Sequence, residues 1–259
     1  MEHWEFSLNY DENQGPRYAA DIILPLYRGA ADDRAIFIEP RLNFANSEFL
    51  LNTGVGYRQL IDGGAWLLGG NMFWDHETSA AHYRLGWGIE ALSRYAELRG
   101  NYYLGLSQER LTKDTGGMQV FEEAVDGYDV EFGAPVPYYS RVKVFGGFNW
   151  YNFKKFDNRY GWTLRTEYTP VKYLVVDWLL SNDTKSNVDW GVTVAFRLPF
   201  GGHEDKDKPL PHPLKLDETL FPESHMQDKL WVLVERHHEI VVEAEQVVAG
   251  VSVEIVRNN

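Results

Sequence analysis

Residues 188–200, VDWGVTVAFRLPF, alternate with a period of two. One face of this predicted strand is wholly apolar and the other is polar or small: Val188, Trp190, Val192, Val194, Phe196 and Leu198 against Asp189, Gly191, Thr193, Ala195 and Arg197. In a soluble protein the apolar face would cover a core. In a membrane barrel it would face lipid, and the polar face would line a wet lumen. The number of strands that repeat the pattern, and the sequence after Phe200, distinguish the two structures.

The composition of the chain favours strands and excludes some classes of partner. Its 259 residues include 9 Trp, 15 Tyr and 14 Phe, and aromatic residues favour strands and gather at membrane interfaces. No run approaches the roughly 18 apolar residues of a spanning helix. A formal net charge of -13 argues against nucleic acid as a partner. The absence of cysteine excludes disulfides and thiolate metal sites.

The first residues, MEHWEFSLNY, have neither the basic start nor the apolar core of a secretory signal peptide. If the protein is exported, we therefore expect this sequence to be a processed or recloned part of a longer one.

Eleven further segments alternate in the same way, which predicts twelve strands of about 7 to 13 residues, near the length of a tilted membrane strand. Pro40 lies inside the third strand and has no N–H to donate, so we expect a bulge or break there. Residues 107–126 form the longest polar gap and are predicted as a loop. The predicted strands are residues 3–10, 18–27, 35–46, 49–61, 65–75, 82–93, 95–106, 128–134, 141–153, 160–169, 173–181 and 188–200.

Two regularities favour a transmembrane barrel over a soluble sandwich. Nearly every strand carries one or two charges in its middle, on the face opposite the apolar one. The predicted connections also alternate between mostly short and mostly longer ones, as in outer-membrane barrels. We therefore predict an all-β fold, a twelve-stranded antiparallel up-and-down transmembrane β-barrel spanning residues 1–200.

The same alternation assigns side chains to the lumen and to the membrane interface. The predicted pore-lining residues are Glu39, Arg41, Arg58, Asn71, Arg84, Glu90, Arg99, Glu131, Arg165, Glu167, Asp177 and Arg197. Tryptophans on the apolar faces are predicted to anchor the barrel at the membrane interfaces. These are Trp4, Trp66, Trp74, Trp150, Trp162 and Trp190.

The sequence changes character after Phe200. Residues 201–223 are charged and rich in proline and cannot continue the sheet. We predict a short helix near residues 223–229, followed by two strand-like runs around Arg236, His237 and His238 that form extended chain or a hairpin. An ordinary porin would end at its closing strand.

Short pieces spread in order over most of the chain resemble the translocator barrel of the intimin/invasin adhesins, the inverse autotransporters of Gram-negative outer membranes. The pieces are LPLY (24–27), GVGYR (54–58), LGGNMFWD (68–75), RLGWGIE (84–90), NYY (101–103), GYDV (127–130), PVPY (135–138) and EYTP (167–170). After the barrel, LWVLVERHHEIVVE resembles the linker of that family. The spacing of Asp189, Gly191, Val194 and Phe196 resembles the closing-strand signal read by the outer-membrane assembly machinery.

The resemblance implies that residues 201–259 re-enter the barrel, thread the pore and carry a C-terminal adhesin passenger to the cell surface. The implied partners are the lipid bilayer, the assembly machinery and the passenger. A barrel of this size has room for one or two extended chains. The residues then expected inside the pore are Leu230, Val232, Val234, Arg236, Ile240 and Val242. The family usually has a periplasmic module before the barrel and Ig-like domains after it; neither lies within these residues, so we expect a translocator unit without its cargo or a member with little cargo.

No residue pattern indicates catalysis, a cofactor or a metal site. Asp129 and Glu131 lie two apart on one strand face and are interpreted as lumen lining. His237, His238 and residues 203–205 (HED) lack ligand spacing on a fixed element. An acyl-hydrolase barrel would need a Ser–His pair, and His76 and His82 have only Ser79 near them in sequence. The glycines of GVG (54–56) and GWG (86–88) are interpreted as relief for close packing in the lumen.

Two alternatives remain open from the sequence. One is a plugged outer-membrane porin without passenger export, in which residues 203–259 act as a gate. The other is a soluble β-sandwich or barrel that binds a ligand.

Overall fold

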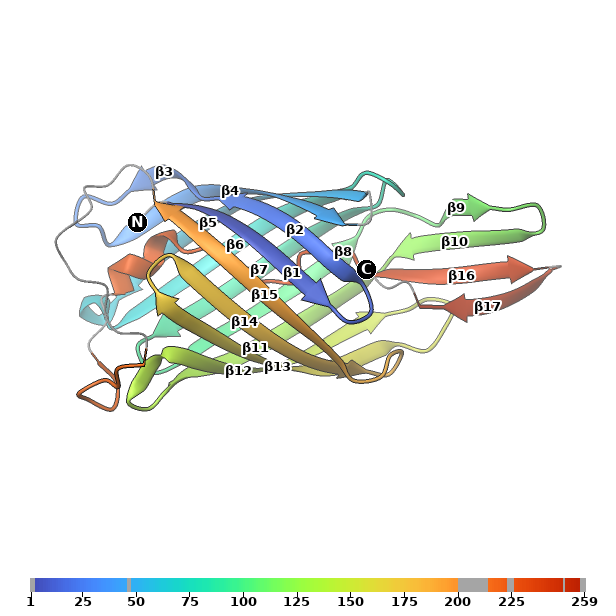
Figure 1. Ribbon diagram of the computed structural model, residues 1–259. Coiled ribbons are helices and arrows are strands. Elements are labelled where there is room, and N and C mark those ends of the chain that lie inside the picture. The colour runs from blue at the N-terminus through green and yellow to red at the C-terminus, as the bar shows by residue number, and fades with distance from the viewer. Residues whose placement is uncertain (1–2, 46–47, 200–213, 223–225, 249, 257–259) are drawn as a thin grey trace.

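The computed structural model describes residues 3–45, 48–199, 214–222, 226–248 and 250–256, and within them the chain is almost entirely antiparallel strand (Figure 1). Thirteen strand segments form one large sheet. They are β1 (His3–Asp11), β2 (Gly15–Ile22), β3 (Leu24–Arg28), β4 (Arg34–Ala45), β5 (Glu48–Ile61), β6 (Trp66–Glu77), β7 (Tyr83–Ser93), β8 (Glu97–Gly105), β11 (Asp126–Val136), β12 (Tyr139–Asn152), β13 (Arg159–Val171), β14 (Leu174–Asp183) and β15 (Asp189–Pro199).

This sheet closes on itself. Apart from β2 and β3, each segment of this sheet pairs with the one that follows it in the sheet's sequence order. β1 also pairs with β15 along its whole length, from His3 opposite Pro199 to Asp11 opposite Gly191. β2 and β3 both pair with β4 and make up one barrel strand, so the thirteen segments form twelve strands. The predicted twelve-stranded up-and-down barrel is confirmed.

The break expected at Pro40 falls in the neighbouring strand. β4 itself is continuous and pairs Pro40 with Thr53 of β5. On its other side the register places Ile22 opposite Pro40, and the strand is interrupted at the next residue, Ile23, which separates β2 from β3. Pro40 has no backbone N–H to donate, so the strand formed by β2 and β3 loses a ladder hydrogen bond at this point.

The two faces of the barrel wall have opposite polarity. Large apolar side chains point outward, and Ile89 in the middle of β7 is 73% exposed. Charged side chains point inward, and Arg58 and Arg84 are 0% and 1% exposed. Buried charges beneath an apolar exterior are the reverse of a soluble protein and match a barrel in lipid. Among the described residues no helix is long and apolar enough to cross a bilayer.

The two ends of the barrel differ. The end that carries the β3–β4, β5–β6, β7–β8, β11–β12 and β13–β14 connections is here called the turn end, and it includes the 3-10 turn η1 (Asp62–Gly64). The opposite end is called the loop end. A second 3-10 element, η2 (Met226–Trp231), lies at the turn end, where residues 223–229 were predicted to be helical. Residues 223–225 of that prediction lie outside the described residues.

Residues 107–126 were wrongly predicted to be a loop. They contain a hairpin, β9 (Arg110–Asp114) and β10 (Met118–Ala124), which extends beyond the loop end (Figure 1). It joins β16 (Val242–Val248) and β17 (Val251–Ile255) in a four-stranded sheet of order β17-β16-β10-β9. The C-terminal hairpin is therefore β16–β17, whereas residues 236–238 belong to an extended stretch before it.

A charge placed on the outer face tests which side of the wall meets lipid. Ile89→Arg should lower the free energy of unfolding by about 2–4 kcal/mol, because residue 89 lies near the bilayer midplane, while Ile61→Arg at the barrel rim should cost only about 0–1 kcal/mol. Urea unfolding in phospholipid vesicles measures both. Equal costs at the two positions would contradict this orientation.

Candidate functional site

Residues 232–241, here called the threading segment, run through the barrel interior from η2 at the turn end to β16 at the loop end (Figure 1). At the turn end, η2 inserts buried apolar side chains into a hydrophobic cluster with the barrel wall. From η2 and the threading segment the cluster contains Met226, Leu230, Trp231 and Val234; from the wall it contains Ile23, Ala35, Phe37, Leu67, Phe73 and Leu92. Phe37 and Phe73 fit there because each packs over a glycine of the neighbouring strand β5. Phe37 lies over Gly56, and Phe73 lies over Gly54.

Arg58 of β5 holds the chain where it leaves η2. Its Nη1 donates to the carbonyl oxygens of Lys229 and Leu230 at 3.4 and 3.2 Å, and to that of Val232. The last carbonyls of a helical turn have no partner within the turn, so the guanidinium fills this need. Glu90 neutralises Arg58 from the adjacent wall.

Glu39 of β4 contacts the next stretch of backbone. The N–H of Val234 donates to both Glu39 carboxylate oxygens, at 3.3 and 3.0 Å, and the Glu39 side chain is completely buried. A backbone N–H at this depth needs a partner, because no other strand pairs with it.

Asp75 of β6 lies at the centre of the polar contacts. It accepts two bonds from Arg236 at 2.8 and 2.7 Å, one from Arg84 at 2.8 Å and one from Asn52 at 2.7 Å. Both guanidinium groups and the carboxylate are at most 1% exposed. A desolvated ion group of this kind persists only when every charge has partners.

Aromatic rings and a glycine shape the space around Arg236. Its guanidinium lies 4.4 Å from the Phe73 ring centre and 5.5 Å from that of Tyr103. A Cβ atom on Gly86 would lie 2.8 Å from Arg236 Nη2, so a side chain at this position of β7 would force the Arg236 guanidinium to shift. The two bonds from Arg236 to Asp75 oppose such a shift.

Arg84 and Tyr103 satisfy the remainder of the segment. Arg84 donates to the carbonyl oxygens of His237, His238 and Glu239 at 2.7, 3.0 and 2.5 Å. The hydroxyl of Tyr103 accepts from the His237 N–H at 2.9 Å. The threading segment is thus bonded mainly through its backbone.

The charges on the opposite wall, β11 to β15, pair mainly with one another and with Glu97 and Arg99 of β8. Glu131 accepts from Arg99 and Arg165 at 3.1 and 2.8 Å, and Arg165 also bonds Asp177 at 3.2 Å. Other pairs in the lumen include Lys143 with Glu97 and Glu167, and Arg197 with Glu5. Nearer the threading segment, Arg41 pairs with Asp21, and Arg165 lies 4.0 Å from Glu235 of that segment. The lumen charges therefore bond the threading segment more on one side of the barrel than on the other.

The structure also places the other residues that were predicted for the linker, the pore lining and the membrane interfaces. In and next to the threading segment, Val234, Ile240 and Val242 are buried, like Leu230 of η2, whereas Val232 is half-buried. Asn71 lies beside Gly88 of the neighbouring strand. The tryptophans lie near the two ends of their strands: Trp4 and Trp66 at the turn end, and Trp74, Trp150, Trp162 and Trp190 at the loop end.

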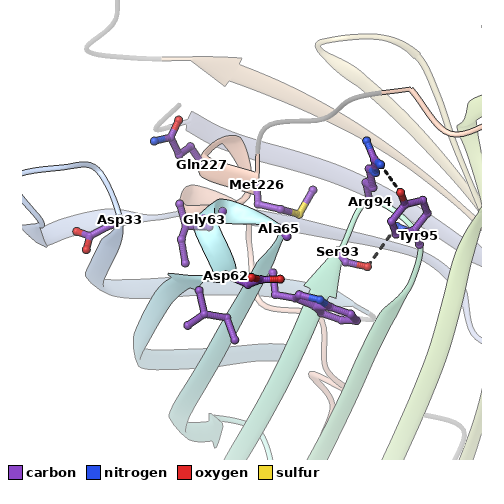
Figure 2. Close-up of a pocket in the computed structure, with 13 residues that line it drawn as sticks. Asp33, Asp62, Gly63, Ala65, Ser93, Arg94, Tyr95, Met226 and Gln227 are labelled. Atoms are coloured by element: carbon purple, nitrogen blue, oxygen red, sulfur yellow. Dashed lines mark hydrogen bonds between the residues drawn. The ribbon is translucent and has the colours of Figure 1, made fainter.

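Within the described residues, cavities lie beside the threading segment and beside η2. A cavity of about 300 Å³ separates residues 236–240 from the wall of β1, β2 and β4, and one of about 210 Å³ lies on the opposite side. A larger hollow of about 710 Å³ opens at the turn end between η1, the β7–β8 turn and η2. Figure 2 shows Asp62, Ser93, Arg94 and Met226 around it.

One buried group was missed from the sequence. His82 lies between Ser107 Oγ, 3.0 Å from its Nδ1, and Glu122 Oε2, 3.3 Å from its Nε2. The order hydroxyl, imidazole, carboxylate resembles a hydrolytic triad, but all three side chains are buried, and His82 is 0% exposed. The group joins the base of the β9–β10 hairpin to the barrel rim. Ser79, the serine considered from sequence, bonds Glu77 instead.

The remaining polar candidates have structural partners. Asp129 accepts from Asn101 and Tyr103, and His237 Nδ1 lies 3.0 Å from the carbonyl oxygen of Glu239. Within the described ranges no three His, Asp or Glu side chains group as metal ligands. Residues 203–205 lie outside those ranges.

Comparisons with known proteins agree with this architecture. Residues 2–206 match the family model described as "Inverse autotransporter, beta-domain". The chain is 24% identical over 222 residues to invasin of Yersinia enterocolitica, covering 76% of this chain and 25% of invasin. It is 32% identical over 90 residues to the inverse autotransporter adhesin YeeJ of Escherichia coli, covering 35% of this chain and 4% of YeeJ. This chain therefore spans a quarter or less of the length of these two relatives.

Two solved structures share the fold. One, reported as "Unveiling the Mechanism Behind the in-meso Crystallization of Membrane Proteins", aligns with a TM-score of 0.76 and 21% identity over 93% of this chain and 99% of its own. The KdgM porin aligns with a TM-score of 0.52 and 9% identity over 78% of this chain and 99% of its own.

Substitutions in the Asp75 group should have unequal costs. Asp75→Asn leaves Arg84 and Arg236 buried without a countercharge and should cost about 3–5 kcal/mol of stability, the usual loss when a buried pair is broken. Arg236→Met should cost less, because Asp75 keeps Arg84 and the methionine still packs on Phe73. Urea unfolding in vesicles measures both variants. A larger loss for Arg236→Met would refute the central position of Asp75.

Proposed function

The chain belongs to the inverse autotransporter β-domain family, and from this premise we propose that it anchors and exports a C-terminal adhesin passenger at the cell surface. Residues 1–200 serve as the outer-membrane translocator, and residues 201–259 as the linker that threads it. The observation that carries the proposal is the continuous chain from η2 to β16, which enters at one end of the barrel and leaves at the other.

The length of the threading segment supports this assignment. Ten extended residues span at most about 33–36 Å, and the hydrocarbon core of a bilayer is about 30 Å thick. Residues 232–241 are therefore long enough to cross the membrane once, with η2 on one side and β16 on the other. Any polypeptide that follows β17 would then begin on the loop side.

The orientation follows from the connections. In outer-membrane barrels the short turns face the periplasm and the longer connections face outward. The turn end would then receive the linker from the periplasm, and the β9–β10 hairpin would stand outside the cell. The assembly machinery is proposed to read β15 as its closing-strand signal.

The alternative is a plugged porin whose linker is a gate. The cavities beside the threading segment favour some passage for water or ions. A gate, however, must leave the lumen readily. Withdrawing Arg236 and the segment's backbone would leave Asp75, Glu39 and Arg58 short of buried partners, which is costly. We therefore propose a resident linker.

A side chain that obstructs the path should block export while leaving the barrel intact. An epitope tag after Asn259 reports on export in intact Gram-negative cells through antibody binding and added protease. Gly86→Trp should abolish most of the surface signal, because Gly86 faces Arg236. Gly146→Trp is the matched control, since a Cβ there meets nothing within 4 Å and the residue lies on the exposed face.

Heat-modifiable gel mobility would show that both variants fold. Surface display that is equally strong in Gly86→Trp and in the parent chain would rule out passage beside Gly86.

A further inference from the structure

We propose that the β9–β10 hairpin is a preformed template on which the emerging chain folds by strand addition, so that β16 and β17 are captured outside the barrel. This inference rests on the proposed export function and adds the site that holds the exported chain. The partner that fits the template is the acidic β16–β17 hairpin of the same polypeptide.

The template is fixed to the barrel by contacts that do not involve the linker. Glu122 of β10 meets the buried ring of His82, which also contacts Ser107 just after β8. Ser107 Oγ in turn accepts from the N–H of Tyr83 at 3.2 Å. These contacts orient β10 before β16 arrives, and a preorganised surface loses less entropy on binding.

The edge of β10 matches β16 without interruption. Seven consecutive pairs join them, from Met118 opposite Val248 to Ala124 opposite Val242. An isolated two-stranded hairpin is marginally stable in water, whereas three or more strands are more stable. β16–β17 alone would be such a hairpin, so it gains most of its stability by joining β10, whose base is already fixed to the barrel. Backbone bonding of an arriving strand to an exposed edge is a general recognition mode.

Glu243 fixes the register of the captured strand. The backbone N–H groups of Lys154, Lys155 and Phe156, in the β12–β13 loop, donate to its carboxylate at 2.9, 2.8 and 2.8 Å. The residue is only 3% exposed. Successive backbone N–H groups form an anion-binding concavity, and bonds of this kind to an ionised carboxylate are strong.

Salt bridges from the loops of the barrel to β16 and β17 add to these contacts. Lys155 pairs with Glu109 of the β8–β9 connection and with Glu245 of β16, and Lys185 of the β14–β15 loop pairs with Glu254 of β17 at 2.7 Å. The hydrogen bond from Lys155 lowers the pKa of the Glu245 carboxyl. A lowered pKa means that this contribution is present at neutral pH and is lost only as the pH falls through the lowered value. Complementary charges favour the correct partner.

Capture has a direction. Residues 242–248 reach β10 only after they have left the lumen, and Val241, whose carbonyl accepts from the Val125 N–H at 3.1 Å, marks the exit. Once the four strands have paired, return into the barrel would require the whole sheet to separate. The template thus opposes backward movement of the linker.

The test measures how fast a tag placed after Asn259 becomes accessible to antibody on intact cells after a pulse of synthesis. Residues 109–123 are replaced by a short Gly-Ser turn; β8 and β11 pair directly with each other, so the barrel wall stays complete. We expect appearance of the tag to slow by about tenfold, which corresponds to ~1.4 kcal/mol in the barrier.

A point variant provides a second measurement if the replacement prevents folding. Glu243→Ala removes the carboxylate held by three N–H groups and should slow tag appearance, whereas Gln246→Ala, three residues along the same strand, removes an uncharged, half-buried side chain and should change it little. Unchanged rates in Glu243→Ala and in any folded hairpin replacement would overturn the template while leaving export standing. A tag that stays inside even in the parent chain would overturn both proposals.

Discussion

The ion group of Asp75, Arg84 and Arg236 inside the barrel is the interaction on which the rest of the structure depends. A chain that crosses a membrane without helix or sheet must have its backbone polar groups satisfied by protein or water. Here Arg58, Glu39, Arg84 and Tyr103 supply those partners along one wall, and Asp75 bonds the guanidinium groups of both Arg84 and Arg236. Without this wall the threading segment would carry unpaired N–H and C=O groups at bilayer depth.

The charged side chains inside the barrel form two groups: one bonds the threading segment, and the other pairs mainly within itself. Strands β4 to β8 supply most of the bonds to the threading segment, whereas the charges of β11 to β15 pair mainly with one another and with Arg99 of β8, with Glu131 shared between Arg99 and Arg165. The cavities on either side of the chain leave space that the linker does not occupy. A passage that is wider than one extended chain and bonds it along one wall is compatible with the export function proposed above.

Much of the fold could be predicted from the sequence, because a period of two decides the face of each side chain. The strands, the outward tryptophans and the inward position of Arg58 follow from it. Partners could not be predicted: Glu39 bonds the N–H of Val234, 195 residues away, and nothing local signals that contact. The β9–β10 hairpin was missed because residues 107–126 are polar, and its partner strand comes from the C-terminal segment. Ser107 was missed because the fold, not the sequence spacing, brings it to His82.

The most direct test of the account is amide hydrogen exchange of residues 232–241 in the folded protein in lipid nanodiscs. If the segment is bonded inside the barrel, the N–H groups of Val234 and His237 exchange slowly, close to those of the surrounding strands. Exchange of both at the rate of an unstructured peptide, while the barrel strands stay protected, would show that the linker does not rest against the charged wall and would contradict the central claim.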